Sequence, residues 1–163
     1  ADLAYSVANL RYVNGSRDQA ITLYRKAIEL KPDHKLALNN LALALADRGD
    51  GRDEALTIIE RAITKFGADA TLLDTKGQIL VSLGRPLEAL PLFGEAASSQ
   101  SGDPLLLLHL ANAYLAAERP AEARTAYRRA RASNVAAAIV TPNDRAIFER
   151  LEAHVRKTAA TGG

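Results

Sequence analysis

The sequence predicts an all-α protein in which four helical hairpins stack into a solenoid and a further helix closes the C-terminal end. The main observation is a skeleton of a small residue, a bulky apolar residue four positions later and an alanine three positions after that, which recurs at intervals of 34 or 35 residues. The four skeletons are Ala20/Tyr24/Ala27, Ala55/Ile59/Ala62, Ala89/Phe93/Ala96 and Ala123/Tyr127/Ala130. Spacings of four and three place each trio on one face of a helix. Self-similarity at this period is typical of a solenoid.

A second recurring element divides each unit into helix A, a tight turn and helix B. A small residue lies upstream of each skeleton, and a turn separates the two: the small residues are Ala8, Ala42, Gly77 and Ala111, and the turns fall at Gly15, Gly49, Gly84 and Glu118. Small residues let the paired helices approach closely. The units span about 1–34, 35–69, 70–103 and 104–135.

The region after the fourth unit predicts a linker and a cap helix over 136–157. Thr141, Pro142 and the acidic Asp144 form a helix start, and Ile147 and Leu151 then lie on one apolar stripe. A solenoid needs such a cap because its last helix B exposes an apolar face. We therefore expect one domain over 1–157 and a flexible tail over 158–163.

Composition agrees with a soluble globular domain. The chain has 163 residues, is 48% hydrophobic and carries 21 basic against 19 acidic residues, so the net charge of +2 is too small to indicate nucleic acid binding. No apolar run of membrane-spanning length and no signal-peptide pattern is present, so neither a membrane partner nor a targeting segment is expected. Nothing in the sequence indicates a compartment. Because the chain contains no methionine and starts in phase with a repeat, we expect it to be a piece of a longer protein.

The sequence predicts neither an enzyme nor a cofactor or metal site. We find no nucleophile with a neighbouring base, no paired-carboxylate site and no phosphate-binding loop. Cysteine is absent, and His34, His109 and His154 have no partner at metal-ligand spacing. No catalytic residue is assigned.

This pattern resembles the tetratricopeptide repeat, whose signature is W-x2-L-G-x2-Y in helix A and A-x3-F/Y-x2-A in helix B, often with a closing proline. The first unit matches through its helix B skeleton and Pro32, and the resemblance covers roughly residues 1–135. The sequence departs from the signature at the opening aromatic residue and at Lys76, where an apolar residue is expected. The resemblance implies a right-handed α-solenoid whose A helices line a concave groove.

The resemblance also implies which side chains line that groove, and the residue types suit a peptide ligand. Asparagine and glutamine can exchange hydrogen bonds with a peptide backbone, while tyrosine and leucine supply apolar contact. His109 is either a pH-responsive groove residue or an ordinary surface histidine. The candidate peptide-binding residues are Tyr5, Asn9, Tyr12, Leu36, Asn39, Asn40, Leu43, Asp74, Gln78, Leu105, Leu108, His109, Asn112 and Leu115.

Chaperone-binding members of this family hold a terminal carboxylate with two asparagines and several cationic side chains. Asn9 and Asn40 stand at the two asparagine positions, but Tyr5, Thr71 and Thr75 occupy the cationic ones. We therefore do not expect an acidic C-terminal peptide of the chaperone type.

Three aspartates expected on the wall, Asp2, Asp47 and Asp74, favour a neutral or mildly basic ligand. Two stripes of leucines on A helices could instead seat an amphipathic helix, or could pack against neighbouring A helices. The stripes are Leu36 and Leu43, and Leu105, Leu108 and Leu115.

These features predict a protein- or peptide-binding scaffold, or adaptor, that uses a concave groove. Two alternatives remain. The chain could be a self-assembly module that stacks through its ends or its convex arginines, or it could be a non-catalytic regulatory domain of an enzyme.

Overall fold

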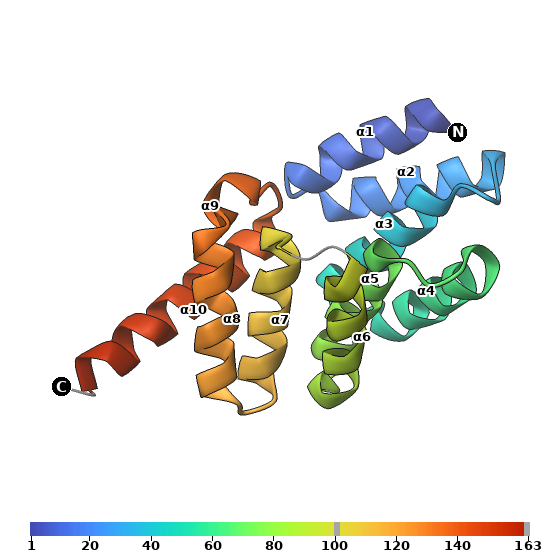
Figure 1. The fold of residues 1–163 in the computed structure, drawn as a ribbon. Coiled ribbons are helices and arrows are strands. Elements are labelled where there is room, and N and C mark those ends of the chain that lie inside the picture. The colour runs from blue at the N-terminus through green and yellow to red at the C-terminus, as the bar shows by residue number, and fades with distance from the viewer. Residues whose placement is uncertain (100–101, 162–163) are drawn as a thin grey trace.

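The computed structural model describes the backbone of residues 1–99 and 102–161, and every regular element in that part of the chain is a helix (Figure 1). The first eight helices form four consecutive hairpins, as the repeat period predicts. The hairpins are α1 (Asp2–Val13) with α2 (Arg17–Leu30), α3 (Lys35–Arg48) with α4 (Arg52–Phe66), α5 (Ala70–Ser82) with α6 (Pro86–Ser99), and α7 (Pro104–Ala116) with α8 (Pro120–Ala132). Two further helices follow, α9 (Val135–Ala138) and α10 (Pro142–Thr161).

The turns between paired helices fall where the sequence places them. Gly15 follows α1 with a φ of 80°, in the left-handed region that glycine enters without steric cost. The turn from α7 to α8 uses Glu118 in the same region, with a φ of 58°. Two A helices start at capping aspartates, because Asp69 and Asp103 accept hydrogen bonds from backbone N–H groups of the first turns of α5 and α7.

The core lies where helix A meets helix B, and its recurring members are the predicted small and bulky residues. Ala8, Ala42 and Ala111 are buried, as are Tyr24, Ile59, Phe93 and Tyr127. Lys76, which departs from the family signature, forms an ion pair with Glu60, with 2.9 Å between Nζ and Oε1. The aliphatic part of the Lys76 side chain thus takes the place of the expected apolar residue, while its ammonium group is paired with Glu60.

The C-terminal helix is longer than the sequence predicts. It starts as expected, because the backbone N–H of Asp144 donates to Thr141 Oγ1 over 3.1 Å and the Thr141 hydroxyl donates to the Asp144 carboxylate over 2.7 Å. The helix then continues to Thr161, past the predicted end at residue 157, so residues 158–161 of the predicted tail are helical. Residues 162–163 of that predicted tail lie outside the described residues.

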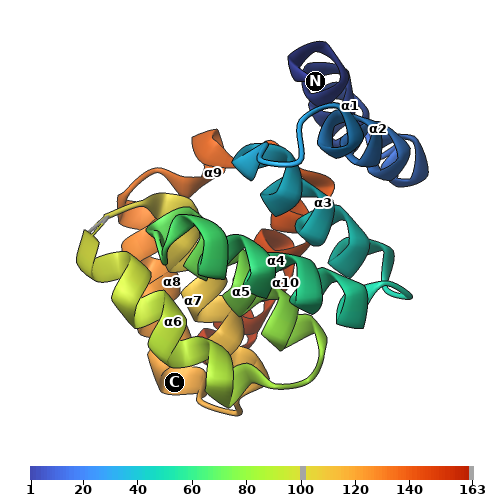
Figure 2. The same ribbon diagram turned by 90° about the vertical axis from the view of Figure 1, so that its right-hand side faces the viewer.

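Helix α10 also packs differently from the predicted cap. We expected it to cover the last helix B, but it contacts α7 more extensively than α8 (Figures 1 and 2). It reaches α8 through Phe148, whose ring centroid lies 5.8 Å from that of Tyr127, and through an ion pair of Glu152 with Arg131 over 2.9 Å. Asp144 follows His109 by 35 residues, so α10 continues the repeat phase as a fifth helix A. Its Arg145 and Glu149, which follow Leu110 and Tyr114 of α7 by 35 residues, are exposed and give this end of the array a polar surface.

The N-terminal end of the solenoid is apolar instead. Leu3 and Leu10 on α1 are 79% and 60% exposed. The residues at the same two positions of the next three A helices are buried: Ala37 and Ala44, Leu72 and Ile79, and Leu106 and Ala113. The two ends of the array therefore present different surfaces. Among the described residues, no helix combines the length and the apolar character needed to cross a membrane.

The crossing of α5 and α6 gives a test of the close packing. A Cβ atom added at Gly77 would lie 2.6 Å from Cζ of the buried Phe93, whereas one added at Gly94 would meet nothing within 4 Å. We expect Gly77→Ala to lower the free energy of unfolding by about 1 kcal/mol or more, because overpacking exceeds the gain in helix propensity. Gly94→Ala, the control, should raise it by about 0.5–1 kcal/mol. Urea unfolding measures both.

If the Phe93 ring is the cause, Gly77→Ala should become neutral or stabilising in a Phe93→Leu background. An unchanged cost in that background would contradict this account of the crossing.

Candidate functional site

The five successive A-type helices, α1, α3, α5, α7 and α10, pack one against the next. A cavity of about 500 Å3 opens between α3, α5 and α7 on one side and α10 on the other. Its lining mixes apolar, amide and charged side chains: Leu43, Ala46, Asp47, Arg52, Gln78, Val81, Ser82, Phe93, His109, Asn112, Leu115, Ala116, Asn143, Ile147 and Arg150. Helix α10 supplies three of these residues, Asn143, Ile147 and Arg150. Its packing beside α7 therefore forms one side of the cavity.

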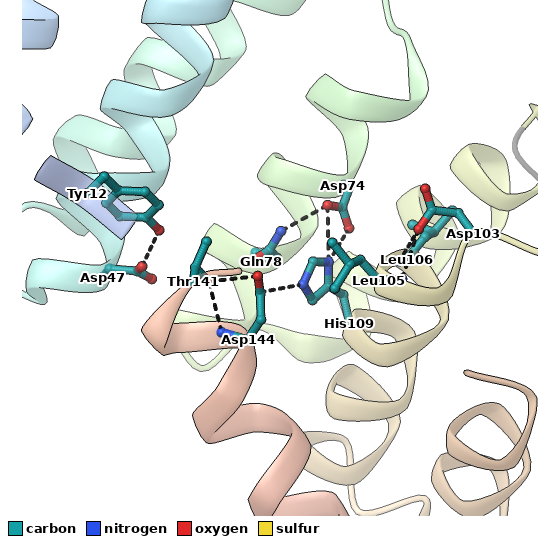
Figure 3. Close-up of polar contacts among 10 residues, drawn as sticks. All are labelled: Tyr12, Asp47, Asp74, Gln78, Asp103, Leu105, Leu106, His109, Thr141 and Asp144. Atoms are coloured by element: carbon teal, nitrogen blue, oxygen red, sulfur yellow. Dashed lines mark hydrogen bonds and ion pairs between the residues drawn. The ribbon is translucent and has the colours of Figure 1, made fainter. Parts of the chain in front are cut away.

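A buried histidine holds α10 in this place. His109 is 4% exposed and lies between two carboxylates, with Nδ1 2.8 Å from Asp74 Oδ1 and Nε2 3.0 Å from Asp144 Oδ1 (Figure 3). Gln78 donates to the other oxygen of Asp74 over 2.9 Å. Figure 3 shows the two carboxylates approaching the ring from opposite sides. One side chain thereby joins α5, α7 and α10.

The protonation states of this cluster follow from burial and charge. Burial alone lowers the pKa of His109, but the charges of Asp74 and Asp144 and its hydrogen bonds to both outweigh that effect and raise the pKa to about 10. The pKa of Asp144 is lowered, because the hydrogen bond and charge of His109 overcome the effect of burial. At neutral pH the cluster is an imidazolium flanked by two carboxylates.

A partly buried acid, Asp47, lies on the same wall. The Tyr12 hydroxyl donates to Asp47 Oδ2 over 2.5 Å and links the end of α1 to α3 (Figure 3). Burial raises the pKa of Asp47, and the hydrogen bond from Tyr12 opposes that effect. Burial likewise raises the pKa of Tyr12, and the charge of Asp47 adds to the shift.

The asparagines of the first two units bind one another. Asn40 donates to Asn9 Oδ1 over 2.9 Å, and the same oxygen accepts from the Tyr24 hydroxyl over 2.7 Å. Asn39 donates to Asn40 Oδ1 over 3.1 Å. The amides that the sequence assigns to ligand contact therefore form an internal network between α1, α2 and α3.

The predicted groove residues differ in their places in the structure. Five line the cavity: Leu43, Gln78, His109, Asn112 and Leu115. Tyr12, Asn39, Leu108 and His109 are buried, and His109 is paired with Asp74 and Asp144 and is not a surface histidine. The remainder lie outside the cavity lining, partly buried or, for Leu36, 48% exposed: Tyr5, Asn9, Leu36, Asn40, Asp74 and Leu105.

Sequence reasoning missed the residues that come from outside the A helices of the repeats. Arg52 starts α4, and Asn143, Ile147 and Arg150 belong to α10, which we expected to cover the other side of the last repeat. The 35-residue spacing from His109 to Asp144 was the available signal, because it places α10 in the phase of a helix A.

The three aspartates expected on the wall lie in different surroundings. Asp74 is paired with His109, and Asp2 does not line the cavity. Asp47 lines the cavity together with two arginines, Arg52 and Arg150. A neutral or mildly basic ligand stays a prediction. No group of three or more histidine, cysteine or acidic side chains in the described part of the chain could hold a metal ion.

Comparison with known proteins agrees with the repeat pattern. A family model of the tetratricopeptide repeat matches residues 4–134. The chain belongs to the tetratricopeptide-repeat family. Proteins of this family are in general scaffolds and not catalysts, and solenoids of stacked repeats present extended concave surfaces. In this tetratricopeptide-repeat chain, α10 and the A helices α3, α5 and α7 enclose a cavity on that surface.

Several solved structures share the fold. A thermophilic tetratricopeptide-repeat protein from Thermus thermophilus is 21% identical, with a TM-score of 0.72 over 93% of this chain and 79% of that one. MamA from Desulfovibrio magneticus RS-1 is 17% identical, with a TM-score of 0.63 over 96% and 95% of the two chains. PcrH, solved with the chaperone-binding region of PopB, is 24% identical, with a TM-score of 0.58 over 75% and 94%. No protein of established function matched the sequence.

The histidine cluster predicts an unusual pH dependence of stability. A pKa raised from 6.5 to about 10 on folding means that the folded state holds the His109 proton more tightly than the unfolded chain. This stabilisation is fully present below pH 6.5 and is lost as the pH rises towards 10, with a slope of at most about 1.4 kcal/mol per pH unit. Urea unfolding across this window measures the slope.

The variant His109→Gln should flatten that slope and lower the free energy of unfolding at neutral pH by about 3–5 kcal/mol, because it leaves the buried Asp144 and the partly buried Asp74 without their cation. Asp144→Asn should retain part of the slope through Asp74. If wild type and His109→Gln have the same slope, the buried imidazolium is excluded.

Proposed function

We propose that this tetratricopeptide-repeat chain is a protein- or peptide-binding scaffold whose ligand enters the cavity between the A helices and α10. The observation that carries the proposal is a cavity whose lining combines apolar and amide side chains. Leu43, Val81 and Leu115 lie around it, together with the amides of Gln78 and Asn112. The apolar side chains can cover an apolar group of a ligand, and amide groups can exchange hydrogen bonds with a peptide backbone.

The size of the cavity supports a side-chain anchor. About 500 Å3 lies within the range of ligand pockets and is too small for a whole helix, but it accommodates one or two apolar side chains. An extended or amphipathic helical segment could lie along the wall and insert such an anchor. PcrH, which has a similar fold, was solved with a segment of another protein, PopB, and this supports a peptide ligand here.

A substitution that fills the cavity tests the proposal. Ser82 lines the cavity near the end of α5 and is partly exposed, so Ser82→Trp should fill the space without removing a core contact. Peptides selected from a random library for binding to the wild-type chain should lose binding to this variant by more than about tenfold, since the apolar anchor has no space. Isothermal titration calorimetry measures the affinity.

Thr57→Trp serves as the matched control, because Thr57 is exposed on α4 and does not line the cavity. It should bind the selected peptides as the wild type does. Failure to select any peptide, or equal binding by Ser82→Trp, would contradict a cavity-based scaffold.

A second candidate function, self-assembly, is favoured by the apolar N-terminal end. Leu3 and Leu10 are exposed at positions that are buried wherever a preceding repeat packs against a helix A. A second copy of the chain that packs on α1 would remove the apolar surface of Leu3 and Leu10 from water, which is favourable. The polar outer surface of α10 offers no matching apolar face, so pairing of two N-terminal ends is the favoured symmetric arrangement.

Sedimentation velocity over a wide range of concentrations tests this candidate. The wild type should form a dimer, and Leu3→Lys with Leu10→Lys should abolish it because charges replace the apolar stripe. Leu87→Lys is the control, since Leu87 is 68% exposed on α6 and far from α1 in the array. A wild-type chain that stays monomeric at high concentration rules out self-assembly.

A further inference from the structure

We propose that the C-terminal end of the array is a second interaction surface, which binds an acidic helical segment of a partner protein through a row of arginines on α8. The members of this arginine row are Arg124, Arg128 and Arg131, and spacings of four and three residues place them on one face of the helix. None of the three lines the cavity between the A helices and α10. The inference therefore goes beyond the proposed function and does not depend on it.

The arginine row occupies positions at which the earlier B helices pack against the next helix A. Arg124 and Arg131 stand where the earlier B helices carry apolar residues that are buried or partly buried: Ile21, Leu56 and Leu90, and Ile28, Ile63 and Ala97. At the position of Arg128, Glu60 of α4 pairs with Lys76 of the next helix A. The last hairpin thus has cations on the face that packs on a following repeat in the earlier hairpins.

Helix α10 covers only one part of this face. Phe148 and Glu152 contact the C-terminal half of α8, and α10 then runs away from α8 towards the C-terminus (Figure 1). Arg128 is exposed and Arg124 is partly buried. The row therefore stays accessible to a partner over the N-terminal part of its length.

Positive charge is in excess on this face. Arg131 and Arg156 both pair with Oε1 of Glu152, over 2.9 and 3.2 Å. Among the residues whose side chains the structure describes, Arg124 and Arg128 have no carboxylate partner. The face thus carries four arginines and one glutamate, an excess of three positive charges, whereas the net charge of the whole chain is +2.

The neighbouring segments do not supply the missing acids. Residues 123–143 contain four arginines and no acidic residue, and residues 153–163 contain no acidic side chain. Glu122, at the start of α8, is paired with Arg119. Carboxylates that balance the arginine row must therefore come from another molecule.

The spacing of the row defines the chemistry of the partner. Like charges four residues apart on one helix repel each other, so carboxylates placed opposite them are stabilising. Arg124 and Arg128 lie about one helical turn apart, roughly 6 Å along the axis. Glutamates four residues apart on a partner helix have the same separation, and the planar guanidinium donors match carboxylate oxygens. The partner that fits is a helix with acidic residues at positions i, i+4 and i+7.

A nucleic acid duplex fits this face less well. The row is only about 10 Å long, so it reaches few phosphates of a duplex. Glu152 lies beside it and repels further phosphates. The observations therefore favour an acidic protein segment.

Binding of a designed peptide tests the inference. The probe is a fluorescent, alanine-based helix with glutamates at positions i, i+4 and i+7, and fluorescence anisotropy at low ionic strength measures its affinity. The wild type should bind it, and added salt should weaken the binding. Arg124→Gln combined with Arg128→Gln should weaken binding by roughly threefold to tenfold, the effect of losing two exposed ion pairs. Arg131 is left unchanged because it holds α10 through Glu152.

A charge-matched control separates the arginine row from the net charge of the chain. Arg11→Gln combined with Arg61→Gln removes two exposed arginines from α1 and α4 and should leave the affinity unchanged. Urea unfolding shows which variants are folded. If the double variant of the row does not fold, Arg128→Glu repeats the test at an exposed residue. The same peptide with glutamines in place of its glutamates should not bind.

The outcomes decide the inference. Weaker binding by the arginine-row variant and unchanged binding by the control support it. Equal effects of the two pairs of substitutions, or no binding of the glutamate peptide at low ionic strength, would overturn it. A short DNA duplex that binds more tightly than the peptide, and loses binding in the same variant, would assign the face to nucleic acid instead. Ser82→Trp should leave binding of the glutamate peptide unchanged, so the cavity-based scaffold is judged separately.

Discussion

The buried imidazolium of His109 is the interaction on which the shape of the concave side depends. It bridges Asp74 on α5 and Asp144 on α10 from its own position on α7. Such an arrangement is costly to desolvate, and it is more costly still to break, because loss of the cation leaves buried carboxylates without a partner. The cluster therefore specifies where α10 docks, and the position of α10 in turn creates the cavity.

The same contact geometry recurs along the array as a ladder of polar pairs between neighbouring A helices. Each pair joins residues 35 positions apart: Tyr5 with Asn40, Tyr12 with Asp47, Asp74 with His109, and His109 with Asp144. These pairs join α1 to α3, α5 to α7 and α7 to α10. The polar side chains in these pairs stabilise the array and are engaged with one another, so they are not free to bind a ligand.

The ends of the solenoid differ for a related reason. Helix α10 continues the phase of the A helices but carries the exposed Arg145 and Glu149 on its outer side. At the other end, Leu3 and Leu10 occupy positions that are buried in the next three units. The C-terminal end therefore presents charged side chains to solvent, while the N-terminal end presents apolar side chains of the kind found at interfaces.

The sequence by itself determined the all-α class, the four hairpins, their turns and the phase of each helix. Those features depend on interactions within one repeat, such as Ala20, Tyr24 and Ala27 on one helical face, and their period can be read along the chain. Four candidate groove residues proved to be buried. Which side chains of an A helix are covered depends on how adjacent repeats are oriented, and the sequence of one repeat does not specify that orientation. The partners of His109 and the presence of Arg52 and Arg150 at one cavity were decided only by the tertiary structure. Residues from three or more helices meet there, and no local pattern specifies the angle at which α10 packs across α7.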